Sequence, residues 1–337
     1  MVFAIPKDSI VLVTGINGYI GSHIADQLLE AGYKVRGTAR TLAKADGVRR
    51  ALEKKHGSGK VETVAVGQMS EDGAFDEAVK GVSGIAHVAS NVSFDENPNT
   101  VIPEVISGVR SILESAAKEP SVKRFVYTSS STAATAPKPN KKFIITKDTW
   151  NNEAIEAAWK PPPYERARAW DVYGASKTQG EQELWKFVAE KKPHFVANAV
   201  LPNTTLGPLI DPTQVGSTAK LVVFDIYNGN TDFATSFPPQ YFIDVRDVAR
   251  LHLVGLVNPD VHNERIFAFA EPFNFHDIFA AVKAAKPDHK LPEDPSSDDR
   301  DLSEIAQMPR SIELLKTVGR DRFIPLGQSI IDTLEGS

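Results

Sequence analysis

The chain has 337 residues, a formal net charge of −5 and no cysteine. Without a long Lys/Arg run, this acidic balance argues against a surface for nucleic acid or anionic membranes. The lack of cysteine excludes disulfides, thiolate nucleophiles and cysteine-bound zinc. No apolar run has the length of a membrane helix, and the first residues lack a signal-peptide pattern. We therefore expect a cytoplasmic protein, monomeric or homodimeric, that acts on a small molecule.

The first two hundred residues alternate short apolar runs with longer helical patterns. Such alternation predicts right-handed βαβ units and a parallel, doubly wound sheet, the Rossmann type of α/β fold. Strands are expected at 10–13, 34–40, 61–66, 85–88, 124–128 and 195–201. Helices are expected at 20–30, at 103–117 and from about residue 171.

The regular alternation decays after Pro202. We expect a dinucleotide-binding domain over residues 1–202, to which 238–258 return. The segments 203–237 and 259–337 are expected to form a smaller C-terminal substrate lobe, with short helices near 311–315 and 329–334. Parallel sheets bind ligands at their carboxyl edge, where the strand order reverses, so the lobe should lie over that edge.

A glycine-rich turn follows the first strand. Glycines 15, 18 and 21 lie between that strand and the first helix. Glycine lets the backbone turn tightly and approach a pyrophosphate, and the helix N-terminus offers free N–H groups. The turn predicts a dinucleotide site lined by Gly15, Asn17, Gly18, Tyr19, Ile20 and Gly21.

The end of the second strand indicates which dinucleotide. An NAD site places an acid there to hold the ribose 2′-hydroxyl, but residues 34–44 contain no acid. Arg40 stands at that place, with Lys44 four residues on. A guanidinium suits a 2′-phosphate, so we predict NADP(H).

Chemistry is expected from Tyr173 and Lys177, which share a helix face at i and i+4. An ammonium near the phenol should lower the pKa of the phenol and make it a proton donor to a carbonyl oxygen. The fifth strand ends in Thr128 and a run of serines, 129–131. One of these hydroxyls can bind the carbonyl oxygen, although spacing does not decide which.

Together, the Tyr-x-x-x-Lys pair, the Thr-Gly-x-x-Gly-x-x-Gly turn and the Ser-Ser strand end resemble the extended short-chain dehydrogenase/reductases. Within that group the chain resembles the dihydroflavonol 4-reductase-like branch, and most of all its fungal NADPH-dependent aldehyde/ketone reductases. The stretches 34–40, 121–126, 199–203 and 238–241 are similar to stretches of those enzymes.

The resemblance implies roles for individual residues. Ser130 matches the catalytic serine, and Arg40 the residue that grips the 2′-phosphate. The remaining cofactor wall is matched by Gln68, Met69, Ala89, Ser90, Thr128, Pro202, Asn203 and Thr204. The wall of the substrate pocket is matched by Phe94, Trp170 and Gln240. In one departure, Gln68 and Met69 stand where the family often has an acid for the adenine amine; the Gln68 amide can still accept that bond.

We therefore expect NADPH-dependent reduction of aldehydes or ketones. Ser130 would polarise the carbonyl, Tyr173 would protonate its oxygen, and Lys177 would tune Tyr173 and anchor the ribose. One alternative is an NAD-dependent sugar-nucleotide epimerase or steroid-type dehydrogenase, and another is a non-catalytic NADP(H)-sensing regulator. No metal is expected, because the histidines form no ligand spacing, and His87 should be a buried core residue.

Overall fold

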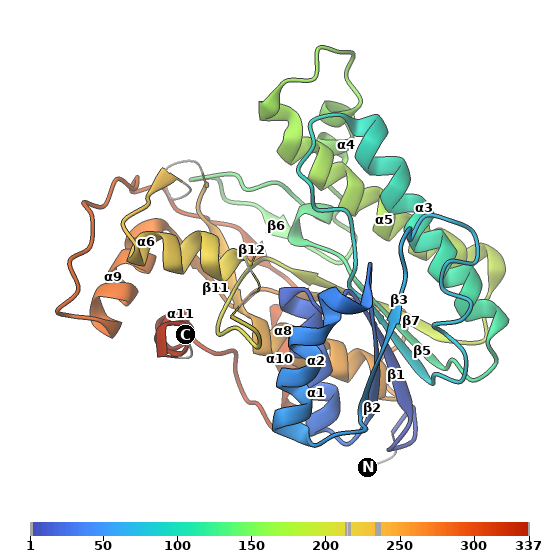
Figure 1. Cartoon of the computed structure of the whole chain (residues 1–337). Helices are drawn as coiled ribbons and strands as arrows, with labels where there is room; N and C mark the ends of the chain where they lie inside the picture. The colour runs from blue at the N-terminus through green and yellow to red at the C-terminus, as the bar shows by residue number, and fades with distance from the viewer. Residues whose placement is uncertain (1–2, 213, 215–216, 233–236, 336–337) are drawn as a thin grey trace.

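The computed structural model describes residues 3–212, 214, 217–232 and 237–335. Its centre is a parallel sheet of seven strands in the order β10-β7-β5-β4-β1-β2-β3 (Figure 1). The strands are β1 (Ile10–Thr14), β2 (Lys34–Ala39), β3 (Val61–Ala65), β4 (Gly84–His87), β5 (Arg124–Thr128), β7 (Val196–Pro202) and β10 (Arg265–Ala268). The order reverses between β1 and β4, which opens a ligand crevice at their carboxyl ends.

Helices cover both faces of this sheet, as expected for a doubly wound fold. On one face lie α1 (Tyr19–Glu30), α2 (Leu42–His56) and α8 (Val245–Val257), and on the other α3 (Pro98–Lys118) and α5 (Ala169–Lys191). The central strands β1, β4, β5 and β7 are almost fully buried, whereas β2 and β3 at one side of the sheet carry exposed polar residues. No helix in the described part of the chain is long and apolar enough to cross a membrane.

All six expected strands are present within one residue of their expected ends. The strand β10 was not expected; it has only four residues and follows the helix α8 in the chain. The helix expected at 103–117 begins earlier, at Pro98. The Asn97 side chain accepts a bond from the N–H of Asn99 and caps the helix, which continues through Pro103.

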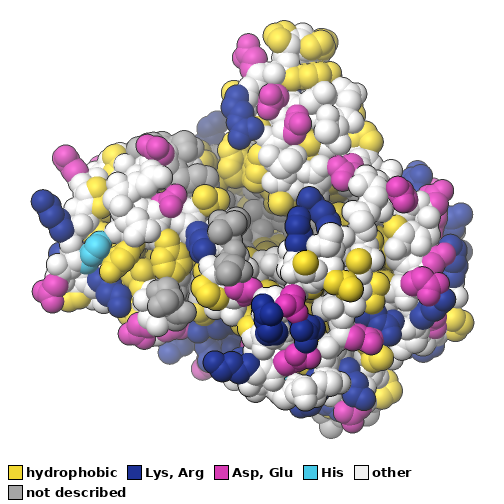
Figure 2. Space-filling model, in the orientation of Figure 1, with side chains coloured by type: hydrophobic (Ala, Val, Ile, Leu, Met, Phe, Trp, Pro, Cys, Tyr) yellow, Lys and Arg dark blue, Asp and Glu magenta, His cyan; other side chains and the backbone are white. Residues whose placement is uncertain are grey.

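The smaller lobe contains a three-stranded sheet in the order β11-β9-β8. These strands are β8 (Thr204–Leu206), β9 (Gln240–Asp244) and β11 (Glu271–Phe273), and they pack with α6 (Asp225–Tyr227), the five-residue π-helix Lys220–Phe224, α9 (Phe275–Ala285) and α11 (Leu326–Glu335). Figure 2 shows the surface hollowed between this lobe and the larger body, with Lys/Arg side chains at the rim.

The division between the two parts differs from the expected one. The range 259–337 was expected in the lobe, yet β10 pairs with β7, and α10 (Met308–Lys316) packs against α8 and β10. The range 238–258 was expected to return to the larger domain. Within it, β9 joins the sheet of the lobe, and only the helix α8 packs on the main sheet. The C-terminal half of the chain therefore passes several times between the main sheet and the smaller lobe.

Four short elements lie between β5 and α5. They are the 3-10 turn Ser131–Ala133, the strand β6 (Ile144–Ile145) and the helix α4 (Asn152–Ala158), followed by a second 3-10 turn at Arg166–Arg168. The strand β6 pairs with β12 (Glu304–Ile305). This pairing ties the C-terminal segment to the loop that leads into the catalytic helix.

Candidate active site

The glycine turn has the geometry of a phosphate cradle. Gly15 has φ +67°, a conformation that L side chains rarely adopt. A Cβ on Gly21 would lie 2.3 Å from the carbonyl oxygen of Gly15, so a side chain there would push the helix off the turn. The backbone N–H groups of Tyr19 and Ile20 open α1, whose positive end faces the crevice. The expected roles of these residues fit this geometry.

The substrate lobe holds this turn from behind. The Tyr19 hydroxyl donates to the carbonyl of Gly207 (2.8 Å), and the His23 ring donates to the carbonyl of Pro208 (2.9 Å). The Gln214 amide donates to the carbonyls of Asn17 (3.2 Å) and Gly18 (3.0 Å). Gln214 was missed by the sequence analysis, because nothing local marks a residue two hundred positions away as a partner of the turn.

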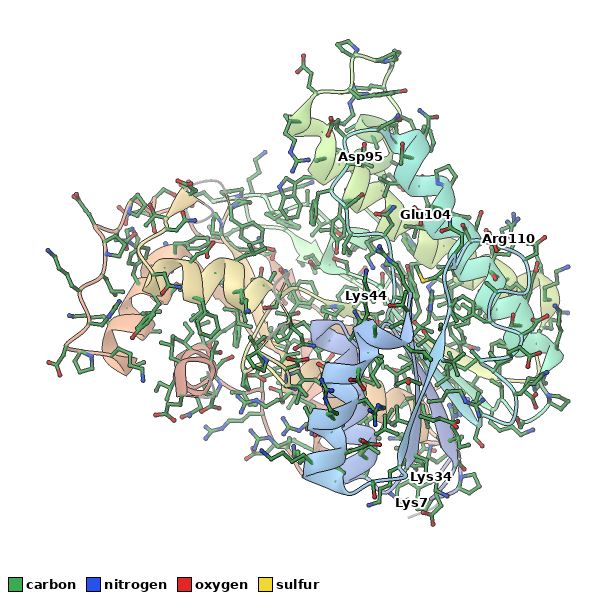
Figure 3. The ribbon with its side chains drawn as sticks, in the orientation of Figure 1. Lys7, Lys34, Lys44, Asp95, Glu104 and Arg110 are labelled. Carbon is green, nitrogen blue, oxygen red and sulfur yellow. The ribbon has the colours of Figure 1, made fainter. Side chains whose placement is uncertain are left out.

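Arg40 and Lys44 lie at the expected place, directly after β2 and in the first turn of α2. Figure 3 shows Lys44 at the upper edge of the sheet and Lys34 at the opposite edge. Both Arg40 and Lys44 are exposed, and neither forms an ion pair or side-chain hydrogen bond within the described residues. Two cations free of internal partners can both bind a 2′-phosphate.

The residues after β3 and β4 were expected to form the adenine side of the crevice. The N–H groups of Val88 and Ala89 donate to the Thr14 hydroxyl (2.9 and 3.0 Å). Beyond them, the Ser90 hydroxyl is buried without a protein partner in the described chain. A buried, unpaired hydroxyl costs free energy unless a ligand or water binds it, so the site fits a dinucleotide rich in acceptors.

The two residues expected at the adenine amine, Gln68 and Met69, have different surroundings. Gln68 is exposed, and its amide nitrogen donates to the Ser70 hydroxyl (3.0 Å). The Gln68 amide oxygen therefore remains available as an acceptor. Met69 packs against the apolar core under α3, near Gly108. Of the two, Gln68 has the group that an adenine amine needs.

The three expected catalytic residues come together at the carboxyl end of β5. Ser130 lies just after β5, and its side chain acts to lower the pKa of the Tyr173 phenol, which burial raises. The Lys177 ammonium donates to the carbonyl of Thr128 (3.4 Å). The Thr132 hydroxyl and N–H also donate to the Ser130 oxygen (2.9 and 3.2 Å), which fixes that side chain. Tyr173 is half-buried, and Ser130 and Lys177 are buried.

Burial sets the protonation of the catalytic groups. It raises the pKa of the Tyr173 phenol, and the hydrogen bond from Ser130 offsets part of this rise. Burial also lowers the pKa of Lys177 to about 8. The sequence analysis expected Lys177 to lower the pKa of Tyr173; in the structure the desolvation of the phenol dominates instead. A raised pKa keeps Tyr173 protonated at neutral pH, as a proton donor requires.

Aromatic rings enclose the Tyr173 side chain. The Phe94 ring stacks on the Tyr173 ring with centroids 4.8 Å apart, and the Trp170 ring contacts Phe94 edge-on at 4.8 Å. Phe237, which the sequence analysis did not name, lies 5.5 Å from Trp170. Phe94 has φ +52°, and Arg166 donates to its carbonyl oxygen (2.6 Å). Phe94 and Trp170 therefore lie where a pocket wall was expected.

The remaining expected residues lie around this centre. Gln240 is buried at the start of β9, and its amide donates to the carbonyl of Pro238 (3.2 Å). Pro202 ends β7, and the Asn203 side chain accepts a bond from the N–H of Thr204 (2.7 Å). The Thr128 hydroxyl bonds to His252 (2.8 Å), and the Thr128 carbonyl accepts the bond from Lys177.

His87 is a satisfied core residue. Its Nδ1 accepts a bond from the Thr14 hydroxyl (2.9 Å), and burial lowers the pKa of the imidazole to about 3. In the part of the chain that is described, no three His, Cys, Asp or Glu side chains gather into a group able to hold a metal ion.

Known proteins are similar to this chain over nearly their whole length. The model of the NAD dependent epimerase/dehydratase family matches residues 11–268. The NAD-dependent epimerase/dehydratase terH of Aspergillus terreus is 44% identical over 98% of this chain and 97% of its own. Aldehyde reductase 2 of Sporidiobolus salmonicolor is 41% identical over 97% and 96%. The solved structure of yeast methylglyoxal/isovaleraldehyde reductase Gre2 complexed with NADPH has 26% identity and a TM-score of 0.81 over 97% of both chains.

Proposed function

The chain belongs to the NAD dependent epimerase/dehydratase family, and from that membership we propose that it reduces aldehydes or ketones to alcohols with NADPH through Ser130, Tyr173 and Lys177. It is an oxidoreductase of the carbonyl reductase type. The observation that carries this proposal is the position of Ser130, Tyr173 and Lys177 at the carboxyl end of β5, where Lys177 donates to the Thr128 carbonyl and the Phe94 ring stacks on the Tyr173 ring.

In this mechanism Ser130 and Tyr173 both bind the carbonyl oxygen of the substrate. Bound NADPH supplies the hydride that reduces the carbonyl carbon. The Tyr173 hydroxyl gives its proton to the oxygen as negative charge develops there, and Ser130 stabilises that charge with its own O–H. Lys177 is held at the Thr128 carbonyl. Its remaining N–H groups would face the Tyr173 oxygen and a ribose hydroxyl of the cofactor.

The cofactor assignment uses the two exposed cations at the end of β2. Arg40 and Lys44 would hold the 2′-phosphate, and the glycine turn the pyrophosphate. Pro202, Asn203 and Thr204 would line the nicotinamide. This cationic end of the site disfavours the NAD-dependent epimerase alternative, because an NAD site holds the ribose hydroxyls with an acid.

The substrate pocket is apolar on the side that the structure describes. Phe94 and Trp170 contact the Tyr173 ring, Phe237 contacts Trp170, and Gln240 would orient the carbonyl group from β9. We therefore propose a small aldehyde or ketone with an apolar substituent as the substrate. We also propose that the enzyme works in the cytosol as a monomer or homodimer, in keeping with its cysteine-free composition.

Replacement of Tyr173 by Phe tests the mechanism. The variant keeps the ring stacked on Phe94 but loses the proton donor, so kcat for ketone reduction should fall by about 10²- to 10⁴-fold. NADPH oxidation is followed by absorbance across aldehydes, keto esters and aryl ketones. NADPH affinity, measured by calorimetry, should stay within about twofold and serves as the control. A variant that reduces ketones at the wild-type rate would contradict the mechanism.

The same substrate panel separates the alternatives. Conversion of a nucleotide sugar by protein purified with bound NAD would favour an epimerase. NADPH binding without turnover of any carbonyl would favour a regulator, although such a protein has no need of the Ser130, Tyr173 and Lys177 arrangement.

A further inference from the structure

A buried ion pair lies behind the catalytic centre. Arg265 Nε is 2.6 Å from a carboxylate oxygen of Glu181, and the two side chains are 7% and 0% exposed. Glu181 belongs to α5, two turns after Tyr173, and Arg265 opens β10 at the edge of the main sheet. Two charges taken fully out of water need precise partners, so the other contacts of this pair indicate what it does.

The carboxylate of Glu181 is bonded directly to the catalytic strand end. The Ser129 hydroxyl donates to its Oε2 at 2.6 Å, and Ser129 immediately precedes Ser130. On the same helix, Trp185 Nε1 donates to its Oε1 at 3.1 Å. The carboxylate therefore joins the end of β5 to α5, the two elements that carry the three catalytic side chains.

Arg265 is fixed on every side of its guanidinium. Its Nη1 donates to the carbonyls of Lys147 (2.7 Å) and Thr149 (2.8 Å). The guanidinium carbon lies 3.9 Å from the centre of the Trp150 ring. The planar fork and the stacking surface of arginine are both used, which lysine could not reproduce. The guanidinium holds the Glu181 carboxylate in one place.

Charge gives the pair a second role. Tyr173, Lys177 and Glu181 follow one another at spacings of four and share a helix face. Lys177 bonds to the carbonyl of Thr128 while Glu181 bonds to the next residue, Ser129. An unpaired carboxylate one helical turn from Lys177 would favour the charged form of the lysine. Arg265 supplies the opposite charge.

The other titratable groups around Lys177 are neutral. His87 on β4 has a pKa lowered by burial to about 3, and burial raises the pKa of Tyr127 on β5, whose ring lies 5.9 Å from the Lys177 nitrogen. Tyr173 on α5 is protonated for the same reason as Tyr127. The Glu181 carboxylate, paired with Arg265, is then the anionic group among those named, and the lowered pKa of Lys177 has burial as its cause.

We propose that Glu181 and Arg265 are positioning residues of the reductase: their ion pair fixes the Ser129–Ser130 strand end against α5, and Arg265 cancels the negative charge that Glu181 places beside Lys177. The catalytic meaning of this inference rests on the proposed function. The arrangement itself is a property of the folded chain and can be tested without substrate or cofactor.

The test is an NMR titration of ¹³C-labelled lysine in the ligand-free protein. The Lys177 side-chain signal is assigned by its loss in Lys177→Arg. Glu181→Gln keeps an acceptor for Ser129 but leaves the Arg265 cation unpaired, so the pKa of Lys177 should fall by about one pH unit. Arg265→Met leaves the carboxylate unpaired, and the pKa should rise by a similar amount. In the double variant the two effects should cancel.

A matched control lies one residue away. Arg310 pairs with Glu264 (2.8 Å), which precedes Arg265 in sequence. Arg310→Met removes an ion pair next to β10 that no bond connects to Ser129, so the pKa of Lys177 should not change. Should Arg265→Met fail to fold, Glu181→Gln and the double variant still decide. An unchanged pKa in Glu181→Gln, or equal shifts in Arg310→Met, would overturn the proposal.

Kinetics provide the second measurement. In Glu181→Gln the alkaline limb of the pH profile of ketone reduction should shift to lower pH. The kcat should fall about tenfold, and the KM for NADPH should not change. A wild-type protein that reduces no carbonyl would refute the proposed function, while the lysine titration would still report on the ion pair. The two failures are therefore distinguishable.

Discussion

At the scale of single residues, some side chains of the site are hydrogen-bonded to other parts of the protein and others are not. Ser130 accepts two bonds from Thr132, and Lys177 is held by the Thr128 carbonyl, so both are placed before any ligand binds. Arg40 makes no such contact within the described chain. The proposed catalytic end is therefore preorganised, whereas Arg40, proposed to select the cofactor, is free to move towards a bound phosphate.

Arg40→Asp tests that selection. The carboxylate would repel a 2′-phosphate and could bind the ribose hydroxyls of NADH. We expect kcat/KM with NADPH to fall by at least about tenfold and the ratio of NADH to NADPH efficiency to rise. Both values come from absorbance assays with one ketone substrate. Lys34→Asp, at the opposite edge of the sheet, is the control and should leave the ratio unchanged. An unaltered ratio in Arg40→Asp would remove Arg40 from the cofactor site.

At the scale of elements, close packing between β1 and α1 builds the phosphate cradle. Gly21 lies in the first turns of α1, where alanine is the better helix former. Its ideal Cβ would nevertheless be 2.3 Å from the Gly15 carbonyl oxygen, which is backbone and cannot move aside. Sterics at the turn therefore outweigh helix propensity at this position.

The same substitution should have opposite effects in two helices. Gly21→Ala should destabilise the fold by about 1–3 kcal/mol because it overpacks the turn, and it should weaken NADPH binding. Gly327→Ala in α11 is the matched control. A Cβ there meets nothing within 4 Å, so alanine should stabilise by up to about 1 kcal/mol. Urea unfolding curves give both values. If both variants changed the free energy of unfolding equally and in the same direction, helix propensity and not the steric clash would control stability at Gly21.

At the scale of the whole molecule, several histidines are buried in the neutral state. Burial lowers the pKa of His23 to about 4, of His87 to about 3 and of His252 to about 4. His252 accepts a bond from the Thr128 hydroxyl and donates to the Val248 carbonyl, so both ring nitrogens are used. Protonation of His87 or His252 breaks the bond that the ring accepts from a threonine hydroxyl, and protonation of His23 places a charge in a buried site.

These three groups predict acid sensitivity. Their folded pKa values lie below the unfolded value of about 6.5, so between pH 6.5 and 4 the unfolded chain binds more protons and stability falls as pH falls. At pH 5 each contributes a loss on the order of 2 kcal/mol. Urea unfolding at pH 7 and pH 5 measures the sum, and His252→Gln should flatten the dependence. A free energy of unfolding that does not fall towards pH 5 would contradict the prediction.

Local patterns in the sequence were sufficient for several features of this protein. Apolar runs predicted six of the seven strands of the main sheet, and the turn at 14–21 predicted the place where α1 begins. The i and i+4 spacing placed Tyr173 and Lys177 on one face of a helix. These features depend on neighbouring residues, whose spacing dictates period, turn and helix face.

Only the tertiary structure decided the rest. The short strand β10, the Gln214 contacts behind the glycine turn and the Phe237 ring beside Trp170 bring together residues far apart in the chain. The raised pKa of Tyr173 depends on burial by several elements at once, which a Tyr–Lys spacing does not reveal. For the same reason the Glu181–Arg265 pair is invisible in the sequence: its partners lie 84 positions apart and meet only because β10 closes the edge of the sheet beside β7.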